Sequence, residues 1–236
     1  MKAQYWQQKW DEEKIGFHQA DINKRLMTYW PQLSSASTEA PTRLDENQKN
    51  CVFVPLCGKS LDMLWLHKQG HQVLGIELSE KAAHAFFNDN HLNFDTHRKG
   101  QFTHFVGTGK ALGITLMVGD YFALEAEHCA SCDAFYDRAS MIAMSPDMRE
   151  QYTRQLARLM RAESTGLLLT ISYDQSHMQG PPFSVADTSV HELLSNSFII
   201  KELAHFSGPE RLGNLKQRGL ETLDERVYLL TRKVLP

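Results

Sequence analysis

Short apolar runs alternate with helically spaced apolar residues along most of the chain. The runs 51–55 and 72–77 are each long enough for one buried strand. Between them, apolar residues recur at helical spacing over 60–69, and a second helical stretch covers 80–91. Ser79 stands directly before that second stretch, as an N-cap does. This order of strand, helix, strand and helix predicts β-α-β units and a mostly parallel sheet.

The same alternation continues to the C-terminus. The remaining predicted strands are 102–106, 114–118, 134–136, 166–173, 198–206 and 226–232, and the remaining predicted helices are 1–13, 20–30, 185–195 and a long helix that begins at Pro146. The strands 102–106 and 114–118 could form a hairpin, and the two consecutive strands at the C-terminus predict an antiparallel edge. We therefore expect an α/β, doubly wound sheet in a single domain over residues 1–236, in which a polar linker (34–50) follows N-terminal helices (1–33).

The first β-α-β unit has a glycine turn and an acidic residue at its second strand end. The turn holds Gly58, and Glu77 follows it by 19 positions at the end of the run 72–77. In nucleotide-binding β-α-β units, an acidic residue about 20 positions after the turn binds the ribose hydroxyls. The unit therefore indicates a cofactor that contains a nucleoside.

The same turn lacks the features of a phosphate site. It has one glycine instead of G-x-G-x-x-G, and Phe53 occupies the first glycine position of a P-loop pattern. S-adenosylmethionine carries ribose hydroxyls and no phosphate, so it suits a turn of this kind. The alternative is an ordinary α/β crossover with a surface glutamate at the strand end.

Bulk composition is that of an ordinary globular protein. Hydrophobic residues make up 42% and charged residues 22%, and the formal net charge is −3. A charge this small gives no reason to expect a nucleic acid or an anionic membrane as a partner. No apolar run approaches the roughly 20 residues of a membrane span, and the first residues have no apolar signal core. We expect a cytoplasmic protein, and a monomer because no apolar helix face is left over.

Metal and redox chemistry receive little support from the sequence. Cys129 and Cys132 have C-x-x-C spacing, but there is no second such pair, and they directly precede a predicted strand. The other two cysteines, Cys51 and Cys57, lie on the first strand and its turn. The 11 histidines include no H-E-x-x-H motif. We expect reduced thiols and no bound metal.

Polar residues follow several of the predicted strands. Besides Glu77, these are Asp120 with Tyr121 after the strand 114–118, and Arg138 after 134–136. Ligands of such sheets bind at the carboxyl ends of the strands. Asp120 and Tyr121 could hold an adenine, although Asp120 could equally be a turn residue. Arg138 could polarise a substrate or hold a cofactor carboxylate, or it could simply pair with Asp137.

A set of motifs supports a family assignment over nearly the whole length. The motifs are Tyr5-Trp6 with Lys9-Trp10, Gly16-Phe17-His18, Val54-Pro55-Leu56-Cys57-Gly58-Lys59-Ser60-Leu61-Asp62, Gly75-Ile76-Glu77-Leu78-Ser79-Glu80, Tyr136-Asp137-Arg138, Ser172-Tyr173 and Gly180-Pro181-Pro182-Phe183. With them the chain resembles the bacterial thiopurine S-methyltransferases. The resemblance implies a seven-stranded-type, Rossmann-like class I methyltransferase sheet, with residues 1–33 as a helical lid over the active site.

The resemblance also implies roles for individual residues. Trp10, Leu56, Glu77 and Arg138 match family positions that contact S-adenosylmethionine, and Phe17 matches a substrate contact. With the strand-end residues Gly58, Asp120 and Tyr121 they make up the expected cofactor site, while Pro182 is a second expected substrate contact and Arg138 the expected catalytic residue. The implied reaction is methyl transfer to the sulfur of aromatic or heterocyclic thiols, with selenium or tellurium compounds as further acceptors. Two alternatives stay open: an O- or N-methyltransferase of small molecules, and a non-catalytic protein that binds S-adenosylmethionine or metalloids.

Overall fold

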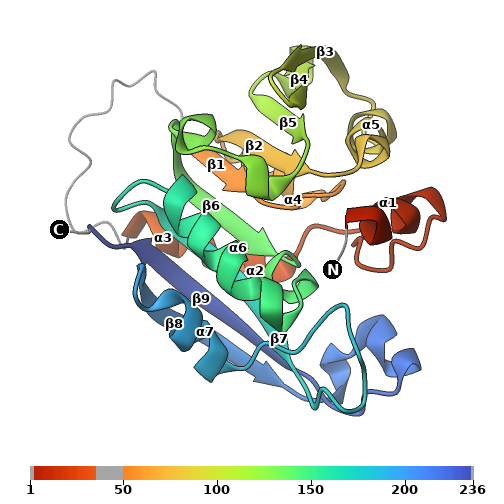
Figure 1. Ribbon diagram of the computed structural model, residues 1–236, viewed down its shortest axis with the longest axis vertical. Coiled ribbons are helices and arrows are strands. Elements are labelled where there is room, and N and C mark those ends of the chain that lie inside the picture. Colours follow the sequence, from red (N-terminus) through yellow and green to blue (C-terminus); the bar gives the residue numbers. More distant parts are fainter. Residues whose placement is uncertain (1–2, 36–49, 235–236) are drawn as a thin grey trace.

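The computed structural model describes residues 3–35 and 50–234 (Figure 1). The α-helices are α1 (Ala3–Asp11), α2 (Lys24–Tyr29), α3 (Pro31–Ser35), α4 (Asp62–Lys68), α5 (Glu80–Asp89), α6 (Pro146–Leu159) and α7 (Asp187–Leu194). The strands are β1 (Cys51–Val54), β2 (Gln72–Glu77), β3 (Asn93–Lys99), β4 (Phe102–Thr108), β5 (Ile114–Val118), β6 (Cys132–Arg138), β7 (Thr165–Ser172), β8 (Phe198–Ser207) and β9 (Asp224–Arg232). None of the described helices is long and apolar enough to cross a membrane.

The nine described strands form one sheet in the order β3-β4-β5-β2-β1-β6-β7-β9-β8. The five central strands, from β5 to β7, pair in parallel, and the strands at both edges pair antiparallel. From β1 the chain first builds the sheet toward β2 and β5, and then returns to add β6 on the other side of β1. This reversal of strand order is the switch point at which open α/β sheets bind ligands.

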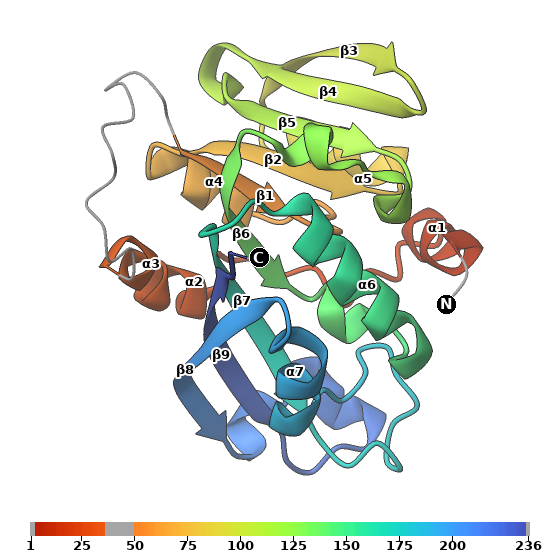
Figure 2. The same cartoon turned by 60° about the vertical axis from the view of Figure 1, so that its left-hand side comes forward.

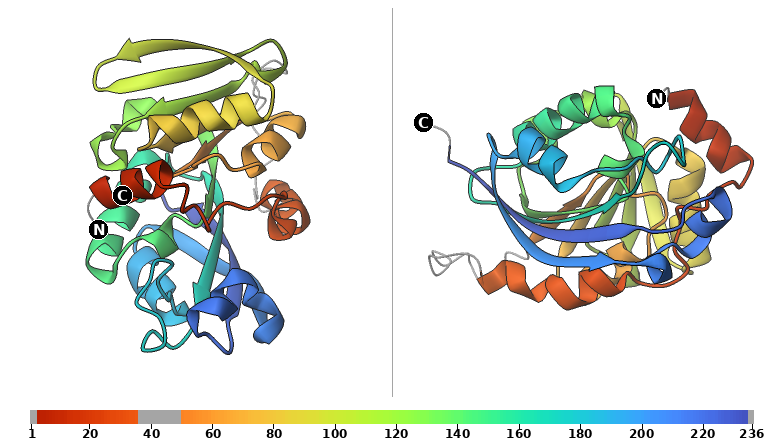
Figure 3. Two further views of the ribbon diagram at one scale, coloured as in Figure 1. Left: turned by 90° about the vertical axis from the view of Figure 1, so that its right-hand side faces the viewer. Right: turned by 90° about the horizontal axis from the view of Figure 1, so that it is seen from below.

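Helices cover both faces of the sheet, as the alternation of apolar residues predicts. In the right-hand view of Figure 3, α2 and α3 (orange) lie on one side of the sheet, and α6 and α7 (green and blue) lie on the other. Strand β1 contributes to both layers, because Phe53 packs in the core on the α6 side while Val52 packs in the core that contains α2 and α4. The doubly wound α/β fold is confirmed.

The predicted strands are all present, and the hairpin of β4 and β5 is confirmed. The antiparallel C-terminal edge is also confirmed, with β9 inserted between β7 and β8. Strand β3 was not predicted. Its sequence contains one apolar residue, Phe94, and nearly all its side chains are exposed at the edge of the sheet. An edge strand with both faces in water has no alternating pattern to reveal it.

The N-terminal helices divide into two parts, so the expected lid of residues 1–33 is too broad. Helix α1 lies beside the end of the sheet toward which the arrows of β2 and β5 point (Figure 2). In contrast, Leu26, Trp30 and Leu33 are buried in the core beneath the sheet. The predicted helix 20–30 corresponds to α2, which begins later, at Lys24, and ends at Tyr29, and Pro31 then begins the separate helix α3. Nearly all of the predicted linker 34–50 lies outside the described residues.

Close packing under the switch point generates a prediction for Gly75 of β2. A Cβ atom on Gly75 would lie 2.5 Å from Cδ2 of Leu116 and 2.6 Å from Sγ of Cys57, both buried. We expect Gly75→Ala to lower the free energy of unfolding by about 1–3 kcal/mol through overpacking, as measured by urea denaturation. Leu112→Ala is the control, since that side chain is 69% exposed. Equal stabilities of the two variants would contradict the packing argument.

Candidate functional site

A cavity of about 870 Å3 opens at the carboxyl ends of the central strands. It lies at the switch point beside β1, and segments of the N-terminal region and of the 180–218 region close its other side. Every site residue that the sequence singled out lines it: Trp10, Phe17, Leu56, Gly58, Glu77, Asp120, Tyr121, Arg138 and Pro182. The structure therefore brings together residues from distant parts of the chain, while their individual roles stay predictions.

The turn after β1 lets neighbouring side chains approach its backbone closely. Leu56 has a φ of 45° and Gly58 a φ of 53°, so the chain turns sharply through the left-handed region at both positions. The amide of Gly58 donates to Oε2 of Glu77 at 2.9 Å. The indole of Trp10 covers Gly58, since a Cβ there would lie 3.3 Å from the Trp10 ring. A larger residue at Gly58 would therefore push the N-terminal segment away from the turn.

Glu77 connects the ends of two strands to the start of α5. Besides Gly58, its carboxylate accepts the amide of Ser79, at 2.9 Å from Oε1. The side chain is buried, and burial raises its pKa above the ordinary 4.5, an effect that the two amide donors partly offset. Each oxygen has a second lone pair, so the carboxylate can still accept hydroxyl donors from the cavity.

Asp120 and Tyr121 follow β5 and differ in what they offer to a ligand. Oδ1 of Asp120 accepts the amide of Phe122 at 2.9 Å and caps a 3-10 turn, as the turn interpretation predicts. This exposed carboxylate also lines the cavity and has a second oxygen. Tyr121 is buried, and its hydroxyl donates to the carbonyl of Tyr152 at 3.1 Å. The rings of Tyr121 and Tyr152 stack at 5.0 Å. The Tyr121 hydroxyl is therefore used within the protein.

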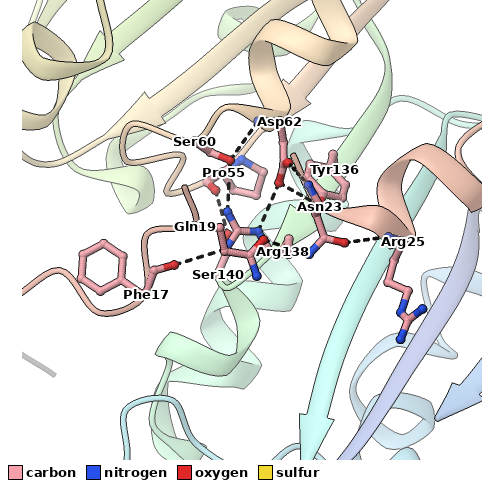
Figure 4. A network of polar contacts seen from close by, with 10 residues as sticks. All are labelled: Phe17, Gln19, Asn23, Arg25, Pro55, Ser60, Asp62, Tyr136, Arg138 and Ser140. Carbon is pink, nitrogen blue, oxygen red and sulfur yellow. Dashed lines mark hydrogen bonds and ion pairs between the residues drawn. The ribbon is translucent and has the colours of Figure 1, made fainter. Parts of the chain in front are cut away.

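Arg138, at the end of β6, contacts the turn that leads into α4 and the N-terminal segment (Figure 4). Its Nε donates to Oδ2 of Asp62 at 3.2 Å, its Nη2 to Oγ of Ser60 at 3.1 Å, and its Nη1 to the carbonyl of Phe17 at 3.3 Å. A guanidinium has five N–H donors, so one hydrogen on each terminal nitrogen is left for a ligand. Arg138 thus joins the N-terminal segment to the switch point in addition to any contact with a ligand.

Asp62 is the acceptor at the centre of this network, and sequence reasoning gave it no role. Its side chain is 1% exposed and also accepts the amide of Asn23 at 2.8 Å and the hydroxyl of Tyr136 at 3.1 Å. Its position in the first turn of α4 is typical of an acidic residue that favours a helix N-terminus. Its other role, as the acceptor that holds distant segments together, is apparent only from its partners in the folded structure.

An aromatic cluster forms the N-terminal wall of the cavity. The ring of Phe17 lies 5.7 Å from that of Trp6 and 5.6 Å from that of Trp10, both edge to face. The segment after α1 is held further by Asn214, whose side-chain amide donates to the carbonyl of Gly16 at 2.9 Å. Apolar rings and fixed backbone on this side can exclude water from a bound substrate.

A second wall of the cavity includes Pro181 and Pro182. Its two proline carbonyls are fixed by side chains: Arg218 donates to Pro181 at 2.7 Å, and the hydroxyl of Tyr173 donates to Pro182 at 2.5 Å. Ile171 and Met144 add apolar surface nearby. The cavity is therefore polar at the strand ends and mostly apolar between the two walls.

The cysteines lie away from this cavity, except for Cys57. All four are free thiols, and Sγ of Cys51 lies 3.0 Å from Sγ of Cys132 where β1 and β6 begin. Burial raises the pKa of Cys129 to about 12. Among residues 3–35 and 50–234 there is no group of three or more histidine, cysteine or acidic side chains that could hold a metal ion. The absence of a bound metal stays a prediction.

The Arg138 network generates a prediction about backbone dynamics. Lysine cannot reproduce the three contacts of Arg138, so Arg138→Lys should release the carbonyl of Phe17. Loss of one charged hydrogen bond of about 1.5 kcal/mol corresponds to about tenfold faster amide exchange in the segment 12–18. Hydrogen exchange with mass spectrometry measures this, and Arg154→Lys on the exposed face of α6 is the matched control. Unchanged exchange in 12–18 would show that the contact does not hold this segment.

Comparison with known proteins places the chain in one family. The family model of thiopurine S-methyltransferase matches residues 1–233. A thiopurine S-methyltransferase of Pseudomonas syringae pv. tomato is 42% identical over 234 residues, which is 99% of this chain and 100% of the relative. One of Shewanella pealeana is 41% identical over 233 residues, with 99% and 100% coverage.

Solved structures at low identity share the fold. The crystal structure of Burkholderia thailandensis 1,6-didemethyltoxoflavin-N1-methyltransferase, bound to 1,6-didemethyltoxoflavin and S-adenosylhomocysteine, superposes with a TM-score of 0.59 at 14% identity. The alignment covers 98% of this chain and 87% of that chain. A methyltransferase dependent on S-adenosylmethionine from Anabaena variabilis gives 0.57 at 12% identity, covering 98% and 95%. The chain belongs to the thiopurine S-methyltransferase family and is an S-adenosylmethionine-dependent methyltransferase.

Proposed function

We propose that the protein methylates the sulfur of aromatic or heteroaromatic thiols, and that selenium or tellurium compounds are further acceptors. One observation carries the proposal: a single cavity joins the carboxylates at the strand ends to a wall of aromatic side chains. Relatives at 42% identity bear the name thiopurine S-methyltransferase, which supports a thiol as the acceptor. We also propose that the protein acts as a cytoplasmic monomer on a small molecule.

The residues present fit S-adenosylmethionine. Glu77 retains a lone pair on each oxygen for the two ribose hydroxyls, and Asp120 retains one carboxylate oxygen for an exocyclic amine. The remaining N–H groups of Arg138 can donate to a carboxylate. The cavity volume of about 870 Å3 lies within the usual range for ligand sites.

The chain's own residues would promote transfer by position and by charge. When bound, the cofactor supplies a methyl group that its sulfonium makes electrophilic. Phe17 and Trp10 provide flat apolar surface for a thiol ring and keep water away from it. The guanidinium of Arg138 favours an anionic sulfur nearby, as cations lower thiol pKa values. The fixed walls of the cavity limit the orientations of the acceptor, which accelerates a bimolecular step.

A transfer assay tests the proposal. The purified protein is incubated with S-adenosylmethionine labelled in its methyl group, together with matched sets of aromatic thiols, phenols and anilines and with selenite. We expect label in the thioether products, and kcat/KM for a thiol above that for the phenol of the same ring. Transfer to phenols or anilines alone would replace the proposal with an O- or N-methyltransferase. Binding of the cofactor without any transfer would favour a non-catalytic binding protein.

A substitution of Glu77 tests the ribose site. Glu77→Ala removes a charged hydrogen-bond acceptor. This should weaken binding of S-adenosylhomocysteine by about 1.5–3 kcal/mol, or about ten- to a hundredfold in affinity. Because Glu77 also accepts the amides of Gly58 and Ser79, the variant should melt at a lower temperature. Calorimetry measures the affinity at a temperature where the variant is folded. Glu80→Ala, at the exposed first position of α5, is the control and should bind normally. An unchanged affinity of Glu77→Ala would exclude Glu77 from the cofactor site.

A further inference from the structure

His18 follows Phe17 in the N-terminal segment and lines the cavity. Its backbone is fixed on both sides, because the carbonyl of Phe17 accepts from Arg138 and the amide of His18 donates to the carbonyl of Ile15 at 2.8 Å. The imidazole is half-buried, and among the described residues neither ring nitrogen has a hydrogen-bond partner. A polar ring held at a cavity wall without a protein partner is free to bond with a ligand.

The other proton acceptors in the cavity wall have partners. Glu77 holds two amides at the turn, and Asp120 caps the 3-10 turn after β5. Glu225 forms two hydrogen bonds with the guanidinium of Arg25, at 2.9 and 3.0 Å. Cys57 is buried, and burial raises the pKa of its thiol well above the ordinary value, so it stays protonated. Among the described wall residues, His18 is the one imidazole, the side chain whose ordinary pKa lies nearest to neutrality.

We propose that His18 is a catalytic base that removes the proton of thiol substrates which are not already ionised at neutral pH. The inference rests on the proposed function and deepens it. It assigns a residue to proton removal and extends the substrate class from acidic heteroaromatic thiols to benzylic and alkyl thiols. For the acidic thiols no base is required, because they bind as thiolates.

The charges around His18 keep it in the basic form. Burial lowers its pKa, and the cations Lys59 and Arg138 lower it further, while Asp62 and Asp89 act in the opposite direction. The two carboxylates are largely neutralised, since Asp89 pairs with Lys59 at 2.8 Å and Asp62 with Arg138 at 3.2 Å. With a pKa below 6.5, the imidazole is unprotonated at neutral pH and accepts a proton.

The step balances as a simple proton transfer. The S–H bond of the thiol breaks, its electron pair stays on sulfur, and the proton binds the lone pair of the imidazole to give an imidazolium. The thiolate then has the electron pair that forms the new bond to the methyl carbon. Once the neutral thioether has left, the imidazolium of His18 returns its proton to water, and the site is ready again.

The test compares two thiols on the wild-type protein and on His18→Gln. The glutamine keeps the size and polarity of the side chain and removes the base. With benzyl mercaptan, which is protonated at neutral pH, we expect kcat/KM to fall by about 10²- to 10⁴-fold. With 4-nitrothiophenol, which is ionised, we expect kcat/KM to stay unchanged. An equal loss for both thiols, or no loss for benzyl mercaptan, would overturn the role of His18.

The pH profile provides a second criterion. For the wild type with benzyl mercaptan, kcat/KM should fall as the pH decreases through the pKa of His18, below 6.5, because the base becomes protonated. In His18→Gln this acidic limb of the pH profile should disappear, and kcat/KM should instead follow ionisation of the thiol itself. The matched control is His205→Gln on the outer strand β8, because His205 does not line the cavity and its ring contacts Asp224. A limb that persists in His18→Gln would assign it to another group.

A spectroscopic readout is independent of turnover. 4-Methoxythiophenol is bound with S-adenosylhomocysteine at a pH below the pKa of the free thiol, and its ultraviolet spectrum is recorded. We expect a larger thiolate fraction in the wild-type complex than in His18→Gln, because an imidazolium beside the sulfur stabilises the thiolate. Equal thiolate fractions in the two complexes would overturn the proposal. If the wild type methylates no thiol in the transfer assay, the proposed function fails, whereas the spectrum still reports whether His18 takes the proton.

Discussion

The buried ion pair between Arg138 and Asp62 determines how the site is assembled. The carboxylate is 1% exposed, and a charge at that depth is tolerated only with a full set of partners. Asp62 obtains them from the end of β6, from Tyr136 beside it, and from the amide of Asn23. Arg138 obtains its own from the turn at Ser60 and from the N-terminal segment. Satisfying this one pair therefore requires the turn, the strand end and the N-terminal segment to meet at one point.

The sheet topology explains why that point is the cavity. Strand β1 lies at the reversal of strand order, so the turn that follows it is flanked by β2 on one side and β6 on the other. Glu77 ends β2 and Arg138 ends β6, which places one carboxylate and one guanidinium on either side of the same turn. The antiparallel strands at the two edges of the sheet lie several strands away. Among them, β3, β4 and β8 contribute no residue to the cavity wall, and β9 contributes only Glu225, near its start.

The local pattern of apolar and polar residues predicted most of the fold, and what it missed has a physical cause. Buried strands are apolar runs, so all except β3 were predicted, whereas β3 has only Phe94 to mark it. Strand-end positions identified Glu77, Asp120 and Arg138, because carboxyl ends of parallel strands share one edge. The role of Asp62 could not be predicted in this way. Its contacts span 39 and 76 positions of sequence, and nothing local distinguishes it from a helix N-terminal acid.

The resemblance to a known family predicted more of the site than the local pattern did, with one limit. It placed Trp10 and Phe17 in the cavity wall, which their aromatic character alone could not separate from core packing. It also implied a lid over the whole of 1–33, although Leu26 and Trp30 pack beneath the sheet. Whether a helix belongs to a lid or to the core depends on what its apolar side chains pack against in the folded protein. The sequence does not reveal this, because successive helices contain similar apolar residues.

The two sides of the cavity are constructed in different ways, and this difference bears on acceptor choice. At the side expected to hold the cofactor, Glu77 and Asp120 accept backbone amides of the turns that follow β1, β2 and β5. At the substrate side, Phe17 and Pro182 lie on connecting segments that side chains hold in place. Connecting segments tolerate change better than strands do. An N-methyltransferase with the same fold at 14% identity shows that the sheet supports other acceptors. If the strand ends hold the cofactor as proposed, acceptor specificity should therefore depend on the segments that contain Phe17 and Pro182.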